Sequence, residues 1–128
     1  MDGRALAVVA LGAALGGVAR YVIGQLFVQR FGAGFPWGTL FINVSGSFLI
    51  GIVAELASTR ALGVTPLARV FLATGILGGY TTFSAFSFEG ITLLGESFWI
   101  SLLYAAGSVV LGFSAAAFGA GITRLGIR

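Results

Sequence analysis

Four long apolar stretches, separated by short polar or glycine-containing turns, dominate the hydrophobic pattern of this chain. They run over about residues 5–28, 36–58, 66–94 and 98–123. Each is long enough to cross the hydrocarbon core of a bilayer, which takes ~20 mostly apolar residues in a helix. The pattern predicts an all-α membrane protein, with residues 1–128 forming a single four-helix transmembrane domain.

Two of the predicted helix starts carry clear signals. Pro36-Trp37 places proline in a first helical turn and tryptophan where a membrane interface is expected. Thr65-Pro66 fits an N-cap followed by proline at the first helical position. The start of the chain, Met1 to Arg4 before an apolar run, resembles a secretory signal. Three further stretches and the lack of a small-residue cleavage site after Ala19 favour a membrane span instead.

The composition excludes a small soluble domain. Of the 128 residues, 58% are hydrophobic and only 9% are charged, whereas soluble domains are about 45–50% apolar and about 25% charged. The seven basic residues are dispersed arginines, so no nucleic-acid-binding face is expected. The chain has no cysteine and no histidine. With no nucleophile–base pair or metal set in the stretches, an enzyme is not expected.

Charge placement predicts the orientation of the chain. An even number of spans puts both termini on one side, and the positive-inside rule favours a cytoplasmic location for that side. Opposite it lie Arg30 and, depending on depth, Arg20. The arginines expected on the side of the termini are Arg4, Arg60, Arg69, Arg124 and Arg128.

Small residues predict close helix packing. Gly12 and Gly16 form a small-xxx-small pair, and helices in lipid associate through such close backbone contacts. A polar path through only four helices would have little wall around it, so at least a dimer is expected.

The third stretch contains an unusual run, Gly78-Gly79-Tyr80-Thr81-Thr82, about halfway along. Each glycine costs about 1 kcal/mol relative to alanine in a helix, so we expect a broken helix near residues 78–82. Non-helical backbone at membrane depth is tolerated only inside protein or beside a wet cavity. Transporters use such breaks as ion sites, with carbonyls facing cations and helix N-termini facing anions. A kink that serves only packing is the alternative.

After the predicted break, two aromatic residues and two hydroxyls recur at helical spacing. Phe83 and Phe86 share one face, and so do Ser84 and Ser87. A phenyl ring has a positive edge, which favours an anion, and a negative face, which favours a cation. Hydroxyls can donate to an anion. Plain core packing is the alternative for the phenylalanine pair.

Two other stretches carry matching polar faces. One consists of Thr39, Asn43 and Ser47, at spacings of four. The other consists of Ser101, Tyr104 and Ser108. Each indicates a polar stripe on an otherwise apolar helix, although interhelical hydrogen bonds alone would also explain them.

Two charged residues fall within predicted spans. Arg20 lies inside the first, where charged residues usually face a cavity or a partner. Snorkelling toward an interface is the alternative. Glu89, one turn past Phe86, is the acidic residue best placed for an intramembrane site.

At these residues the chain resembles the Fluc-type fluoride ion channels, the CrcB family. The resemblance extends through all four stretches, and its most specific part is in the third. The matching pieces are Gly16-Gly17-x-x-Arg20-Tyr21, Gly38-Thr39-Leu40-x-x-Asn43, Gly75-x-x-Gly78-Gly79-x-Thr81-Thr82-Phe83-Ser84-x-Phe86-Ser87-x-Glu89 and Tyr104-x-x-x-Ser108.

The resemblance implies a passive, fluoride-selective channel that exports fluoride across the bacterial inner membrane and gives fluoride resistance. It implies an antiparallel, dual-topology homodimer in membrane lipid, with two pores. It also implies a central sodium ion held by the backbone carbonyls of Gly78 and Thr81. The roles implied for the pore are ring-edge contacts from Phe83 and Phe86, an oriented Asn43, a polar track of Thr39, Ser84, Tyr104 and Ser108, an electropositive vestibule from Arg20, and participation of Glu89 in permeation.

Two features depart from that pattern. Gly112 stands where another hydroxyl is expected one turn after Ser108. The arginine bias is also larger than free dual insertion predicts, so pairing with an oppositely biased partner is an alternative to the homodimer.

Two other functions stay open at this point. A small four-span, proton-coupled multidrug or cation exporter would need a titratable carboxylate near the bilayer centre, for which Glu89 is the candidate. A non-transporting subunit of a larger membrane complex is the third possibility.

Overall fold

The computed structural model describes residues 2–59 and 63–127, and this part of the chain is helical almost throughout. Four units are long and apolar enough to cross a membrane: Gly3–Phe31, Trp37–Thr59, Pro66–Glu96 and Phe98–Gly126. The predicted all-helical fold with four apolar helices of spanning length is therefore confirmed. The elements are α1 (Gly3–Phe31), α2 (Trp37–Thr59), α3 (Pro66–Arg69), the π-helix η1 (Val70–Leu77), α4 (Gly78–Tyr80), α5 (Phe83–Glu96) and α6 (Phe98–Gly126).

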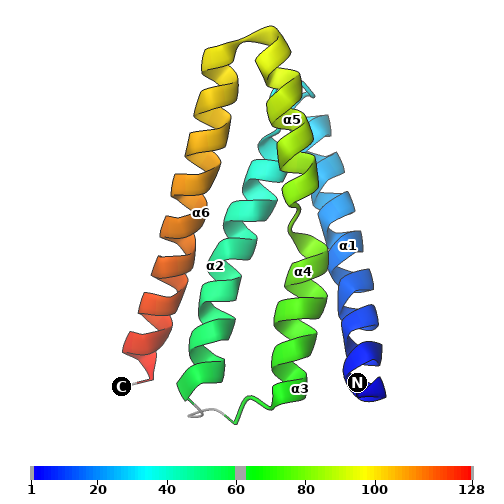
Figure 1. The fold of residues 1–128 in the computed structure, drawn as a ribbon, viewed down its shortest axis with the longest axis vertical. Coiled ribbons are helices and arrows are strands. Elements are labelled where there is room, and N and C mark those ends of the chain that lie inside the picture. Colours follow the sequence, from blue (N-terminus) through cyan, green and yellow to red (C-terminus); the bar gives the residue numbers. More distant parts are fainter. Residues whose placement is uncertain (1, 60–62, 128) are drawn as a thin grey trace.

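The four spans run up and down, so that α1 begins and α6 ends at the same end of the bundle (Figure 1). α6 packs along α2, while α1 packs along η1 and α4 in the first half of the third span. After the break, α5 leans over to pack on α6, and the two form a hairpin at the opposite end (Figure 1). Two of the arginines behind the predicted orientation, Arg60 and Arg128, lie outside the described residues.

The predicted helix starts and turns can be compared with the observed caps. Thr65 caps α3 by accepting a 3.1 Å hydrogen bond from the N–H of Ala68, as its sequence predicts. The gap left between the third and fourth predicted stretches, residues 95–97, is shorter in the structure, because Ser97 alone separates α5 from α6. Its N–H bonds to the Leu93 carbonyl at 2.7 Å, which ends α5, and its side chain caps α6.

Glycines let the backbones of α1 and the third span touch. A Cβ added at Gly12 would lie 2.8 Å from the Gly75 Cα, and one at Gly79 would lie 2.5 Å from the Ala13 carbonyl oxygen. A Cβ at Gly16 would clash with the carbonyl oxygen of Ile76. The Gly12 and Gly16 pair thus packs within one chain.

An ion pair joins α2 and α6 near their C-terminal ends. Arg124 donates from Nε and Nη2 to the two carboxylate oxygens of Glu55, at 3.0 and 2.9 Å. Glu55 is largely covered, with 12% of its side chain exposed, while Arg124 is 62% exposed. One of the arginines on the side of the termini is therefore paired.

The predicted break in the third span is confirmed, but the glycines do not make it. Gly78–Tyr80 is helical, and the extended residues are Thr81 (φ −81°, ψ 158°) and Thr82 (φ −150°, ψ 116°). Gly79 is needed for its small size against Ala13 rather than for an unusual backbone angle. The π-helical stretch Val70–Leu77, which packs on α1, is a feature that the hydrophobic pattern does not indicate.

Candidate functional site

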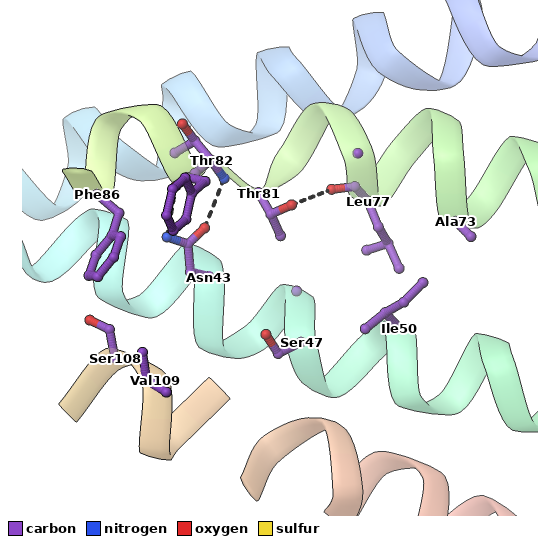
Figure 2. A pocket seen from close by; sticks show the side chains of 13 residues that line it. Asn43, Ser47, Ile50, Ala73, Leu77, Thr81, Thr82, Phe86, Ser108 and Val109 are labelled. Carbon is purple, nitrogen blue, oxygen red and sulfur yellow. Dashed lines mark hydrogen bonds between the residues drawn. The ribbon is translucent and has the colours of Figure 1, made fainter. Parts of the chain in front are cut away.

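The break in the third span is joined to α2 through one amide side chain. Oδ1 of Asn43 accepts from the Thr82 N–H at 2.8 Å, and Nδ2 of Asn43 donates to the Thr82 carbonyl at 3.0 Å. Figure 2 shows the Asn43 amide facing Thr82 from the neighbouring helix. A residue outside any helix thus has both of its backbone polar groups satisfied, as burial requires.

The break leaves backbone carbonyls without their helical donors, and the two predicted cation ligands are among them. In a continuous helix the N–H of residue i bonds to the carbonyl of residue i−4. Here the Thr82 N–H bonds to Asn43 instead of the Gly78 carbonyl. The Ala85 N–H likewise bonds to the Thr82 hydroxyl, at 3.2 Å, instead of the Thr81 carbonyl. The two carbonyls predicted to hold a cation are therefore among those at the break that lose their helical donors.

A cavity of about 380 Å³ opens beside the break and is called here the break cavity. It lies between α2, both halves of the third span, and α6 (Figure 2). Its lining combines hydroxyls, an amide and two phenyl rings with aliphatic side chains. The residues are Asn43, Gly46, Ser47, Ile50, Ala73, Leu77, Gly78, Thr81, Thr82, Phe83, Phe86, Ser108 and Val109.

The two phenyl rings of the motif both border the break cavity. Their centroids are 5.6 Å apart, and Phe86 continues the aromatic contact to Tyr104 at 5.3 Å. Phe83 is 79% exposed in the single chain, whereas Phe86 is half-buried. The exposure of Phe83 leaves one side of its ring open to a ligand or to another chain.

Glu89 lies one turn beyond Phe86 and receives two short hydrogen bonds. The Thr39 hydroxyl donates to one carboxylate oxygen and the Tyr104 phenol donates to the other, each at 2.7 Å. Three helices, α2, α5 and α6, therefore meet at this carboxylate. Thr39 and Glu89 also line a second cavity of about 400 Å³. Residues 32–37, Thr92 and Glu96 line the same cavity.

Of the remaining predicted residues, Ser108 and Ser84 lie at or next to the break cavity, whereas Arg20 does not. Ser108 lines the break cavity, and its hydroxyl is buried with no hydrogen-bond partner among residues 2–59 and 63–127. Ser84 is 3.3 Å from the Thr82 hydroxyl, next to the lining. Arg20 is half-buried on α1 and lines neither of these two cavities.

Sequence reasoning missed three residues that build the site. Thr82 provides both the bonded backbone and the N-cap of α5. Tyr80 is 8% exposed and shares a 2.9 Å hydrogen bond with Ser45. The cap was open to prediction, since threonine before a helical run is a known start signal. Ser45 lies off the polar stripe of α2, and nothing in the spacing pairs it with Tyr80.

The fold and site define a class of protein: an integral membrane protein of four spans with an interrupted helix beside a mixed polar and aromatic cavity. Residues 7–120 match the family described as "CrcB-like protein, Camphor Resistance (CrcB)". The chain belongs to this family.

Curated relatives support the same assignment. The chain is 51% identical over 117 residues to "Fluoride-specific ion channel FluC" of Rhizobium meliloti (strain 1021), covering 91% of this chain and 93% of the relative. It is 52% identical over 112 residues to the protein of that name from a strain of Thermus thermophilus, covering 87% and 88%. The relative from Roseiflexus sp. (strain RS-1) is 47% identical over 118 residues, covering 91% and 94%.

Proposed function

We propose that this chain is a fluoride-selective channel that passively exports fluoride across the bacterial inner membrane and so gives fluoride resistance. The observation that carries the proposal is its similarity, at 51% identity across 91% of the chain, to a relative named "Fluoride-specific ion channel FluC". The membrane location follows from the four apolar helices and the family. Since the relatives are named channels, the exporter alternative is not favoured.

The chemistry of the break cavity suits a small, strongly hydrated anion. A pore that admits fluoride must replace its water shell with other donors. The edges of Phe83 and Phe86 supply positive charge density. The buried hydroxyl of Ser108 supplies a donor whose partner is not among the described residues. Ser84 and the second N–H of the Asn43 amide, which has no partner within residues 2–59 and 63–127, extend this set in the proposed path.

Beyond Phe86 the proposed path reaches the hydroxyls of Thr39 and Tyr104. Both already donate to the carboxylate of Glu89. An anion that reaches this level must therefore compete with Glu89 as the acceptor of these hydroxyls. In this proposal Glu89 takes part in permeation because it either keeps the hydrogen bonds from Thr39 and Tyr104 or gives them up to the anion.

The proposed assembly is an antiparallel, dual-topology homodimer with two pores. The strong exposure of Phe83 supports a second chain at this face, because one chain leaves the path unenclosed. The bias of arginine toward the side of the termini would instead favour a partner of opposite bias, which cross-linking can distinguish. Arg20 would add positive charge to a vestibule formed with the partner.

A structural sodium ion at the centre of the dimer is part of the proposal. The carbonyls of Gly78 and Thr81 fit it, since both have lost their helical donors. Carbonyl oxygens at helix breaks are suitable ligands for sodium. A bound ion would compensate these oxygens and fix the break, and two chains would together contribute four of them.

Efflux from liposomes tests the function. Purified protein reconstituted in vesicles loaded with fluoride or chloride should release fluoride, with no proton gradient, and retain chloride. Fluoride release no faster than from empty vesicles would refute the channel. Release that requires a proton gradient would favour the exporter.

A further inference from the structure

A further cavity, of about 820 Å³, lies between α2 and the start of the third span and is called here the Arg69 cavity. It is at the end of the bundle where α1 begins and α6 ends (Figure 1). Its wall carries a positive charge from Arg69 and, within residues 2–59 and 63–127, no acidic residue. The residues are Ala57, Gly63, Val64, Thr65, Pro66, Arg69, Val70, Ala73 and Thr74.

The π-helix η1 brings Arg69 and Thr74 to the same wall. Arg69 is the residue before η1, and Thr74 lies five positions further on. In an α-helix, residues five apart are about 140° apart around the axis, on different faces. The hydrogen bonds of a π-helix join residues five apart, so such residues lie on one face. The unusual helix of the third span thus places an arginine and a threonine at one cavity.

Two hydroxyls of the wall can donate to a ligand. Threonine in a helix often bonds to the carbonyl four residues back, and Thr92 and Thr123 do so at 3.0 and 2.8 Å. Thr74 forms no such bond in the part of the chain that the structure describes. The oxygen of Thr65 accepts from the Ala68 N–H at 3.1 Å, which leaves its O–H free to donate.

The charge of Arg69 is not neutralised within residues 2–59 and 63–127. The ion pair in that part of the chain joins Arg124 to Glu55. A guanidinium binds phosphate oxygens through two parallel, charge-assisted hydrogen bonds. An arginine with two hydroxyl donors beside it is therefore suited to a phosphate group.

The depth and the wall of the cavity favour a lipid over a dissolved anion. The span Pro66–Glu96 has 31 residues, whereas ~20 cross the hydrocarbon core, so its first turn is expected at the level of the headgroups. Val64, Val70 and Ala57 add apolar surface next to the polar groups, as a phospholipid has apolar chains next to its phosphate. A wall without a described acidic residue offers nothing to the cationic group of a zwitterionic lipid.

We propose that the Arg69 cavity binds the phosphate of an anionic phospholipid through Arg69, Thr65 and Thr74. The lipid would lie against the half of the third span that precedes the break, since Ala73 borders both this cavity and the break cavity. The site is independent of the proposed function, because neither its evidence nor its test involves ion flux.

Native mass spectrometry of the purified full-length protein in detergent tests the site. The probes are phosphatidylglycerol and phosphatidylcholine with the same acyl chains, and glycerol 3-phosphate as a soluble phosphate. Phosphatidylglycerol should bind about fivefold more tightly than phosphatidylcholine, the effect of one basic residue near an anionic headgroup. Equal affinity for the two lipids would overturn the proposal. Binding of glycerol 3-phosphate as tight as that of phosphatidylglycerol would overturn it too, and would assign the cavity to a free phosphate.

Arg69→Gln should remove this preference and weaken phosphatidylglycerol binding about fivefold. Arg69→Lys should weaken it less, because lysine keeps the charge without the planar fork. Arg30→Gln is the matched control, since Arg30 is an exposed arginine in the last turn of α1, at the other end of the bundle. Equal losses in Arg69→Gln and Arg30→Gln would show unspecific attraction and overturn the site.

Thr74→Val tests the hydroxyl without changing the charge. It should weaken phosphatidylglycerol binding about two- to tenfold, as expected for one lost hydrogen bond. Thr92→Val is its control, because the Thr92 hydroxyl is already bonded to the Phe88 carbonyl. Both threonines and Arg69 are exposed, so the variants should melt as the wild type does without lipid. Unchanged binding in Thr74→Val would overturn the site that η1 is proposed to assemble.

Discussion

The phenol of Tyr104 donates a 2.7 Å hydrogen bond to Oε2 of Glu89 and thereby ties α6 to α5 at the centre of the candidate path. Tyr104 is 2% exposed, and its ring also contacts Phe86 and Phe35. A buried phenol with a carboxylate acceptor is a strong local constraint, because hydrogen bonds to charged groups are stronger than neutral ones.

Tyr104→Phe should destabilise the fold by removing this bond alone. The ring and its aromatic contacts stay, so the loss should be about 1.5–3 kcal/mol, the range for a hydrogen bond to a charged group. Thermal unfolding in detergent measures it. Tyr21→Phe is the control, since Tyr21 is 68% exposed. Equal melting of the two variants would show that the Tyr104 hydroxyl contributes little.

Phe83→Ile and Phe86→Ile should each suppress fluoride efflux while the protein still assembles. Isoleucine keeps an apolar side chain but lacks the positive ring edge that an anion can contact. Liposome efflux and size-exclusion chromatography measure the two properties. Phe113→Ile, at a residue 77% exposed on α6, is the matched control and should conduct as wild type does. Normal flux in both Phe83→Ile and Phe86→Ile would defeat the ring-edge assignment.

Gly16→Ala should disrupt the packing of α1 on the third span, whereas Gly17→Ala should not. Both substitutions gain about 1 kcal/mol of helix propensity, so the comparison isolates packing. A Cβ at Gly16 would clash with the Ile76 carbonyl, while at Gly17 it meets open space within the described part of the chain. Yield and melting temperature should fall for Gly16→Ala only. Similar behaviour of both variants would argue against the close contact.

The sequence was sufficient for the architecture because lipid imposes a simple rule, that apolar stretches of spanning length become helices. The position of the break was predictable, but the residues that form it were not. Glycine and threonine propensities indicated residues 78–82, yet the extended residues are Thr81 and Thr82, and Gly79 serves the contact with Ala13.

The pairings across the site were beyond sequence reasoning. The polar stripe of Thr39 and Asn43 was visible, but their partners, Glu89 and Thr82, lie 50 and 39 residues away. Which side chain meets which depends on how far α5 leans toward α6 after the break. That direction is a property of the packed bundle, which the spacing of residues along one helix does not contain.

Thr82→Ala should weaken the response of the protein to sodium, and Thr82→Ser should preserve it. The Thr82 hydroxyl caps α5 by accepting from the Ala85 N–H. Without this cap the Ala85 N–H is free to bond to the Thr81 carbonyl, as in a continuous helix, and that oxygen becomes a poorer cation ligand. Serine keeps the capping oxygen.

Melting temperature measured against sodium concentration, with N-methylglucamine as the balancing cation, tests this prediction. A ligand that binds the folded state raises stability by RT ln(1 + [L]/Kd), so the curve reports sodium affinity separately from basal stability. Loss of the cap should cost about 1 kcal/mol at every sodium concentration, and in Thr82→Ala the curve should also shift to higher sodium. A wild-type curve that does not depend on sodium would remove the proposed ion. Parallel curves for wild type and Thr82→Ala would show that the Thr81 carbonyl does not depend on the cap.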